Sequence, residues 1–334
     1  MNYTKKQRAK SEVTNAIPAG DMTVKRSAFL SAQRARRMIK RIIWLVILVV
    51  VAFYAYKYID QYFLREVDVD SRLDRTSIHY VTDLYYSDGR YYDEYLNDNE
   101  KRLYLALLSD IKEAETESRI NCVDYGYSTY SECATSIAFL SKILILDHPD
   151  MFWYDSSSYQ SRVDRSYIKI AHSYTTRSSI TIKLIEARML RKLDEIASEM
   201  ADLSDYEKVK AVYDWYGSNV RYSAYDTRAT DSALNVLLKG NGTPKGFAMA
   251  SQLLFQRLGI DSTIIAGSKD GLDHYWNLVF IEDGYYWFDA SLGTKDRKNN
   301  PNFYDGFINV DQTEYGVNIL NLNKYTLGEK YLES

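Results

Sequence analysis

A glycine-rich turn at residues 240–248 restricts the possible folds of this chain more than any other segment. It reads GNGTPKGFA, and a largely apolar stretch continues to about Leu258. Thr243 is a good N-cap, and Pro244 suits the first helical turn, because the N–H that proline lacks would have no intrahelical partner there. We therefore expect a helix that begins at this turn and runs to about Leu258.

Three strands are expected after this helix, over about 261–267, 274–281 and 285–290. Asp283 and Gly284 form the Asp-Gly pair that is typical of a tight hairpin between the last two strands. His274 opens the middle strand, and Asp289 lies near the end of the last one. The spacing therefore predicts a histidine and an aspartate on neighbouring strands.

These segments resemble the core of the transglutaminase-like superfamily, a papain-type fold. The family pattern for the turn is roughly G-x-G-V-C-x-G-Y-A, and Pro244 stands here at the position of the cysteine. The family's histidine segment, H-A-W-N, is similar to residues 274–277 (HYWN), and its W-Y-x-x-D-x-T segment is similar to residues 286–291 (YWFDAS). The resemblance covers about residues 96–316.

The resemblance implies a role for each matched residue. In the family a cysteine thiolate attacks, a histidine moves the proton and an aspartate orients the histidine ring. It implies that His274 and Asp289 are an inherited catalytic pair and that Pro244, which has no lone pair for attack, occupies the nucleophile position. The candidate binding residues around them are Gly242, Thr243, Trp276 and Asn277.

Two functions remain open at this point. Loss of the nucleophile favours a catalytically inactive module that binds a peptide, cell-wall or envelope protein ligand, by analogy with the fold. The alternative is an active acyltransferase or cysteine-protease-like hydrolase with a non-standard nucleophile, such as Thr243 or Ser251. Thr243 is better explained as the N-cap, and Ser251 lies about 10 Å along the helix axis from Pro244 at about 1.5 Å per residue.

Charge and hydropathy divide the N-terminal part of the chain from the rest. Residues 1–41 carry eleven lysines and arginines and two acids, a net charge of +9, which leaves −12 for the remainder of a chain with an overall charge of −3. Residues 42–56 are apolar and uncharged, and extension to residue 59 approaches the roughly 20 residues that a bilayer requires. We expect a single-pass cell-membrane protein with a cytoplasmic N-terminus; a cleaved signal peptide is the alternative.

These expectations give a domain plan. It consists of a basic cytoplasmic tail (1–41), a transmembrane helix (42–59), a stalk (60–95), an N-terminal extension domain (96–200) and a transglutaminase-like domain (201–334). The expected fold class is α+β, with a papain/transglutaminase-like core in which a helix packs on an antiparallel sheet, an N-terminal α/β extension and one transmembrane helix. The membrane segment accounts for the basic tail, so no nucleic-acid partner is expected.

Local patterns predict the elements upstream of the glycine-rich turn. Residues 150–183 alternate polar and apolar side chains, which is typical of strands. Apolar residues at helical spacing over 185–200 predict a helix, and Ser204 with Glu207 forms a capping box that opens the next one.

The cysteines and histidines suggest neither a disulfide framework nor a metal site. The chain has two cysteines, Cys122 and Cys133, and the sequence slightly favours two buried thiols over a disulfide. The four histidines are scattered, without the paired spacing of metal ligands. We therefore expect no metal and no cofactor.

Overall fold

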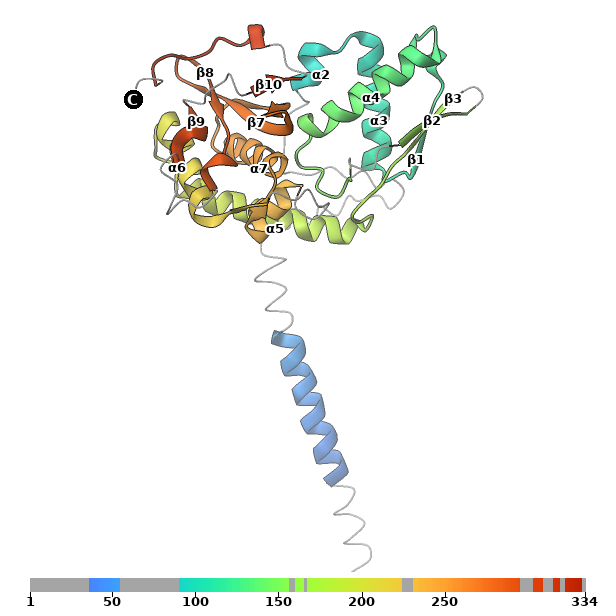
Figure 1. Ribbon diagram of the computed structural model, residues 1–334. Helices are drawn as coiled ribbons and strands as arrows, with labels where there is room; N and C mark the ends of the chain where they lie inside the picture. Colours follow the sequence, from blue (N-terminus) through green and yellow to red (C-terminus); the bar gives the residue numbers. More distant parts are fainter. Residues whose placement is uncertain are drawn as a thin grey trace, which may run out of the picture. The chain divides into compact units, whose positions relative to one another are not determined.

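The computed structural model describes residues 36–54, 90–155, 160–164, 167–223, 231–294, 303–308, 315–318 and 322–331. The chain divides into two compact units, residues 1–66 and 67–334 (Figure 1).

The described part of the first unit is a helix over residues 36–54, whose side chains are all exposed. Among the described residues, no helix has both the length and the apolar character needed to cross a membrane. The predicted transmembrane segment, 42–59, extends beyond this helix, and residues 55–59 lie outside the described residues, as does most of the basic tail.

A five-stranded antiparallel sheet forms the centre of the second unit (Figure 1). Its order is β10-β6-β7-β8-β9, with β6 (Ser262–Lys269), β7 (Leu272–Ile281), β8 (Gly284–Phe288), β9 (Phe307–Ile308) and β10 (Tyr315–Val317). The three predicted strands are β6, β7 and β8. The hairpin between β6 and β7 turns at Asp270 and Gly271, which both have positive φ, as a type I′ turn requires. Asp289 directly follows β8 instead of lying within the strand.

Helix α7 (Pro244–Arg257) packs on β6 and β7, and all of its residues from Gly246 to Phe255 are buried. Thr243 caps the helix by accepting a hydrogen bond from the Gly246 N–H, and Pro244 is its first residue, as predicted. The turn before α7 needs glycine at position 242, because a Cβ there would collide with the side chain of Val236. Gly242 also belongs to β5 (Asn241–Gly242), which pairs in parallel with β4 (Arg221–Tyr222).

Two further helices and a π-helical turn lead into this core. They are α5 (Ser179–Ser198), α6 (Asp205–Asn219) and the turn at Asn235–Lys239. The capping box of Ser204 and Glu207 opens α6 as predicted, with both reciprocal hydrogen bonds present. The prediction of strands throughout 150–183 is wrong at its end, because Ser178 caps α5 and residues 179–183 are helical.

The N-terminal part of the second unit combines helices with a small sheet. The helices are α2 (Arg90–Tyr95), α3 (Asp98–Lys112) and α4 (Tyr130–Asp147), with a 3-10 turn at Cys122–Tyr125. The sheet has the order β1-β3-β2, formed by β1 (Glu117–Ile120), β2 (Gln160–Asp164) and β3 (Tyr167–Ala171).

A disulfide joins Cys122 to Cys133 within this part. The slight preference for two buried thiols is therefore wrong. Both cysteines are buried, as expected, but the sequence could not show that the turn after β1 brings their two Cα atoms to 5.8 Å from each other.

One continuous core connects the two parts of this unit. Helix α2 lies within the predicted stalk (60–95), yet the Tyr91 side chain is 1% exposed and its hydroxyl donates to the Ile264 carbonyl on β6 at 2.6 Å. The carboxylate of Asp147 accepts hydrogen bonds from the backbone N–H groups of Tyr91 and Tyr92. The buried apolar side chains form a single cluster, so residues 90–95 belong to the folded unit and no separation occurs near residue 200.

Candidate functional site

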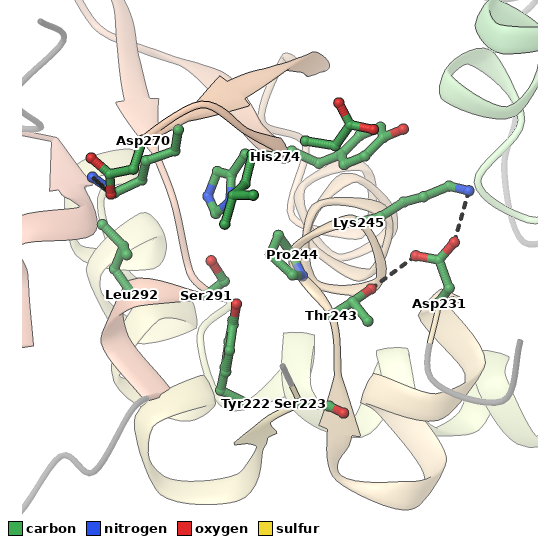
Figure 2. A pocket seen from close by; sticks show the side chains of 14 residues that line it. Tyr222, Ser223, Asp231, Thr243, Pro244, Lys245, Asp270, His274, Ser291 and Leu292 are labelled. Carbon is green, nitrogen blue, oxygen red and sulfur yellow. Dashed lines mark hydrogen bonds and ion pairs between the residues drawn. The ribbon is translucent and has the colours of Figure 1, made fainter. Parts of the chain in front are cut away.

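A cleft of about 570 Å³ opens at the start of α7 (Figure 2). Thr243, Pro244 and Lys245 line it from the helix, and the β6–β7 hairpin lines it from Lys269 to His274. The other walls come from the end of β4 and from the segment after β8. The cleft therefore lies where the glycine-rich turn meets two predicted strands.

His274 and Asp289 form a buried pair in the wall of this cleft. The His274 Nε2 lies 2.6 Å from the Asp289 Oδ2, and the two residues are 8% and 1% exposed. His274 is near the start of β7, and the backbone N–H of Asp289 donates to the Gly306 carbonyl at 2.7 Å. Since β7 and β8 pair antiparallel, the hairpin brings the two side chains together across fifteen residues of sequence.

The Asp289 carboxylate has three further hydrogen bonds. Ser291 donates to Oδ1 from its hydroxyl at 2.6 Å and from its backbone N–H at 3.1 Å, and the Tyr315 hydroxyl donates to Oδ2 at 2.9 Å. Burial alone would raise the pKa of Asp289, but His274, Ser291 and Tyr315 together lower it below its ordinary value. Asp289 is therefore a carboxylate that accepts the Nε2–H of His274.

This arrangement leaves the second nitrogen of His274, Nδ1, on the side of the ring away from Asp289. Among the described residues, Nδ1 has no hydrogen-bond partner. Figure 2 shows the imidazole and Pro244 at the same cleft, and both residues line it. In chemical terms, an oriented imidazole with one occupied nitrogen faces the start of a helix.

Polar contacts on the opposite wall fix the helix start. The Thr243 hydroxyl donates to Asp231 Oδ1 at 2.8 Å, and Lys245 Nζ lies 3.0 Å from Asp231 Oδ2 (dashed lines in Figure 2). Asp231 therefore bridges the N-cap and the second residue of α7. The hydroxyl proton of Thr243 is committed to a carboxylate, which makes Thr243 a structural cap and leaves it poorly suited to attack.

Aromatic rings pack against the His274–Asp289 pair. Trp276 lies two residues along β7 and stacks at 6.2 Å from the His274 ring, and it also stacks on Trp287 at 5.1 Å. The Tyr315 ring packs edge-on against Trp276 at 4.9 Å. This packing restricts the rotation of His274 and encloses the carboxylate of Asp289.

Three of the four predicted binding residues do not line the cleft. Thr243 does, but Gly242 is buried in the turn and Trp276 is buried beneath His274. Asn277 points toward α7, where its side-chain N–H donates to the Ala248 carbonyl at 3.1 Å. These residues support the cleft from the buried core. Alternate side chains of β7 leave the strand on opposite faces, and both faces are packed.

The alternative nucleophile Ser251 is also remote from the cleft. It is fully buried, its hydroxyl donates to the Tyr216 hydroxyl at 3.0 Å, and it is not among the lining residues. Both cysteines of the chain are in the disulfide, so neither is a thiol.

Sequence reasoning missed several residues that shape the site. Ser291 follows Asp289 by two positions, and this spacing is typical of an Asx-turn, so the signal was present. Tyr315 reaches Asp289 only because β10 pairs with β6, which no local pattern reveals. The charged residues of the rim, Asp231 and Lys269 among them, carried no distinguishing signal.

Residues 194–291 match the family model of the transglutaminase-like superfamily. The chain contains a transglutaminase-like domain. The matched segment includes the start of α7, His274 and Asp289, so the cleft belongs to this domain. The domain has an α+β fold with a helix packed on an antiparallel sheet, as the sequence predicted.

Individual relatives are distant. Kyphoscoliosis peptidase from Mus musculus is 23% identical over 158 residues, which are 38% of this chain and 24% of the relative. The chain thus matches about a quarter of that protein's length. A solved transglutaminase is 14% identical with a TM-score of 0.32, over 42% of this chain and 45% of its own. A proposed cysteine protease from Cytophaga hutchinsonii is 15% identical with a TM-score of 0.30, over 48% and 65% of the two chains.

Proposed function

We propose that this transglutaminase-like protein is catalytically inactive and uses its cleft to bind a peptide or a protein of the cell envelope. One observation carries the proposal: Pro244 is the first residue of α7 and shares the cleft with the His274–Asp289 pair. In our assignment, Pro244 occupies the position at which an active relative has its cysteine.

Acyl transfer by this family's chemistry requires a nucleophile beside the histidine. A proline side chain has neither a lone pair nor a proton to offer. The hydroxyl groups of Thr243 and Ser251 are committed to Asp231 and Tyr216, and Ser251 is not at the cleft. The pair can therefore orient a ligand without forming a covalent intermediate with it.

The character of the cleft favours a peptide. Its volume of about 570 Å³ is within the usual range for ligand pockets, and its walls offer hydroxyl groups, charged groups and aromatic surface. Papain-type clefts accept extended chains, an inference from fold analogy. A stem peptide of the cell wall and a segment of an envelope protein both fit this description.

We also propose that the protein is anchored in the cell membrane through residues 42–59, with its large unit outside the cytoplasm. The apolar side chains from Ile42 to Tyr54 are exposed, and the preceding tail carries a net charge of +9. The Cys122–Cys133 disulfide supports an oxidising compartment for the large unit. Protease treatment of intact cells should then degrade the large unit and spare a small basic fragment.

One observation favours an enzyme instead, namely the retention of an oriented His274–Asp289 pair. Such a pair can act as a general base toward water, which would make the protein a hydrolase with a non-standard nucleophile. Binding and hydrolysis differ in turnover, so a single experiment can separate them.

The experiment uses the purified full-length chain and its His274→Ala variant. The immobilised native chain should retain peptides from a partial digest of cell envelopes, and the variant should retain fewer. Neither protein should release ammonia from a glutamine-containing peptide or new amino termini from casein, with or without a thiol reductant. Turnover that depends on His274 would contradict the proposal and favour the hydrolase.

A further inference from the structure

Two features meet at the inner end of the cleft. The first is the N-terminus of α7, a helix of fourteen residues whose Thr243, Pro244 and Lys245 line the cavity. The aligned peptide dipoles of a helix place about half a positive charge at this end, which attracts anions.

The second feature is the imidazole of His274. It is more than nine-tenths buried, lines the same cavity, and among the described residues its Nδ1 has no hydrogen-bond partner. Its Nε2–H is committed to the ionised Asp289, whose two oxygen atoms are already occupied by Ser291, Tyr315 and His274 itself. Nδ1 is therefore a polar atom in the cavity wall that can form a hydrogen bond with a ligand.

We infer that a carboxylate group of the ligand binds in this position, between the start of α7 and the Nδ1–H of a protonated His274. The inference rests on the proposed function, since it places the ligand's carboxylate where an active relative would hold its thiolate. The helix end and the imidazolium would stabilise a carboxylate for the same electrostatic reasons that stabilise a thiolate.

The charges around the cleft select among anions. The lining residues include three acids, Asp231, Asp270 and Asp273, but only two lysines, Lys245 and Lys269. Lys245 is paired with Asp231 at 3.0 Å, and Lys269 lies 3.8 Å from Asp270. With His274 protonated, the three acids are balanced by three cations, so the cleft has no excess positive charge for a phosphate dianion and is more compatible with the single charge of a carboxylate.

Proton uptake follows from the geometry. Because His274 Nε2 carries the proton that it donates to Asp289, a neutral His274 presents a lone pair at Nδ1, which would repel a carboxylate. Binding therefore requires a second proton on the ring, so affinity should rise as the pH falls. The titratable groups in contact with this ring are Asp289 and Tyr315. The other titratable groups that line the cavity are Tyr222, Asp231, Lys245, Lys269, Asp270, Asp273 and Tyr275.

The test follows the ring nitrogens of His274 by NMR in the full-length chain labelled with ¹⁵N-histidine, which contains only four histidines. The probes are N-acetyl-Ala-Ala with a free carboxylate, the same dipeptide as its amide, N-acetyl-glutamate amide, and inorganic phosphate. At least one of the two acids should shift the His274 signals saturably and raise its titration midpoint, whereas the neutral amide should not. The acid that binds more tightly shows whether a terminal or a side-chain carboxylate is preferred.

Two results with these probes would overturn the inference. One is an equal response to the acid and its amide, or no response to either acid. The other is a response to phosphate at least as large as the response to the acids. Signals of His148 and His172, which do not line the cleft, serve as internal controls.

A pair of variants tests the position without any ligand. Pro244→Asp would supply a carboxylate from the first residue of α7, and Pro244→Asn would supply a neutral side chain of the same shape. The titration midpoint of His274 should be higher by about one pH unit or more in the aspartate variant. Equal midpoints in the two variants would overturn the carboxylate site. The proposed function would still be supported if the immobilised native chain retained envelope peptides.

Discussion

His172 and His274 are each less than a tenth exposed, yet their surroundings differ in the feature that matters for function. His172 follows the small three-stranded sheet. Its Nε2 lies 2.6 Å from the Ser118 hydroxyl and its Nδ1 lies 3.4 Å from the Tyr154 hydroxyl. His274, on the five-stranded sheet, has a partner at Nε2 and faces a cleft with Nδ1.

The comparison shows that residue types alone do not identify a site. Asp110, Ser118 and His172 are the three residue types of a hydrolase triad, and Ser118 contacts both of the others. The serine stands in the middle, however, so its hydroxyl donates to the carboxylate and not to the imidazole. Ser118 is 1% exposed, and burial lowers the pKa of His172 to about 4, so that the ring stays neutral. Both ring nitrogens of His172 have a hydrogen-bond partner, whereas His274 has one only at Nε2 among the described residues.

The largest difference between the two clusters should appear when their carboxylates are removed. Asp289→Ala would leave four donor groups, on His274, Ser291 and Tyr315, without their acceptor, and should cost about 3–5 kcal/mol of unfolding free energy. Asp110 is only partly buried and accepts from Ser118, so the matched Asp110→Ala change should cost about 1–2 kcal/mol. Urea denaturation measures both, and equal costs would contradict the account.

The disulfide should stabilise the N-terminal part without affecting the cleft. Replacing Cys122 and Cys133 by alanine removes a cross-link between residues eleven positions apart, which should cost about 3 kcal/mol. Thermal unfolding measures the loss, and the ¹⁵N signals of His274 should stay unchanged. A shift of those signals would show that the two regions are coupled more tightly than we describe.

The pH dependence of stability should report His172. Its folded pKa, about 4, is below the ordinary value of 6.5, so the unfolded chain binds the proton first as the pH falls. This group therefore stabilises the fold above pH 6.5, and that stabilisation is lost between pH 6.5 and 4. Asp147, with a pKa raised by burial to about 7, acts in the opposite direction over the same range.

Because these effects overlap, the measurement compares the native chain with His172→Gln. The free energy of unfolding should fall less steeply in the variant between pH 6.5 and 4, by up to about 1.4 kcal/mol per pH unit. An identical slope in the two proteins would mean that His172 is protonated in the folded state.

Local signals accounted for much of the fold and for the centre of the site. The caps at Thr243 and Ser204 marked two helix starts. The Asp283–Gly284 pair marked the hairpin that brings His274 to Asp289, although its turn residues are Glu282 and Asp283 and Gly284 begins β8. These features depend on neighbours in sequence, so a sequence can display them.

The remaining features depend on partners that are distant in the chain. Tyr315 reaches Asp289 through the pairing of β10 with β6, and Tyr91 joins the core through a hydrogen bond to β6. The polar residues of the cleft rim come from five separate segments. The sequence favoured buried cysteines, but it carried no information that Cys122 and Cys133 lie beside each other.

The most direct test of the central claim places a thiol in each cluster. The native disulfide leaves no free thiol, so Pro244→Cys and Ser118→Cys each introduce the only reactive candidate. At pH 6, iodoacetamide should alkylate Pro244→Cys about tenfold or more faster than a model thiol, because the helix N-terminus and His274 lower the pKa of the new thiol. Adding His274→Gln should remove most of this acceleration, and Ser118→Cys should remain unlabelled while folded. If the thiol at position 244 reacts no faster than the one at position 118, the start of α7 is not the nucleophile position of a transglutaminase-like site.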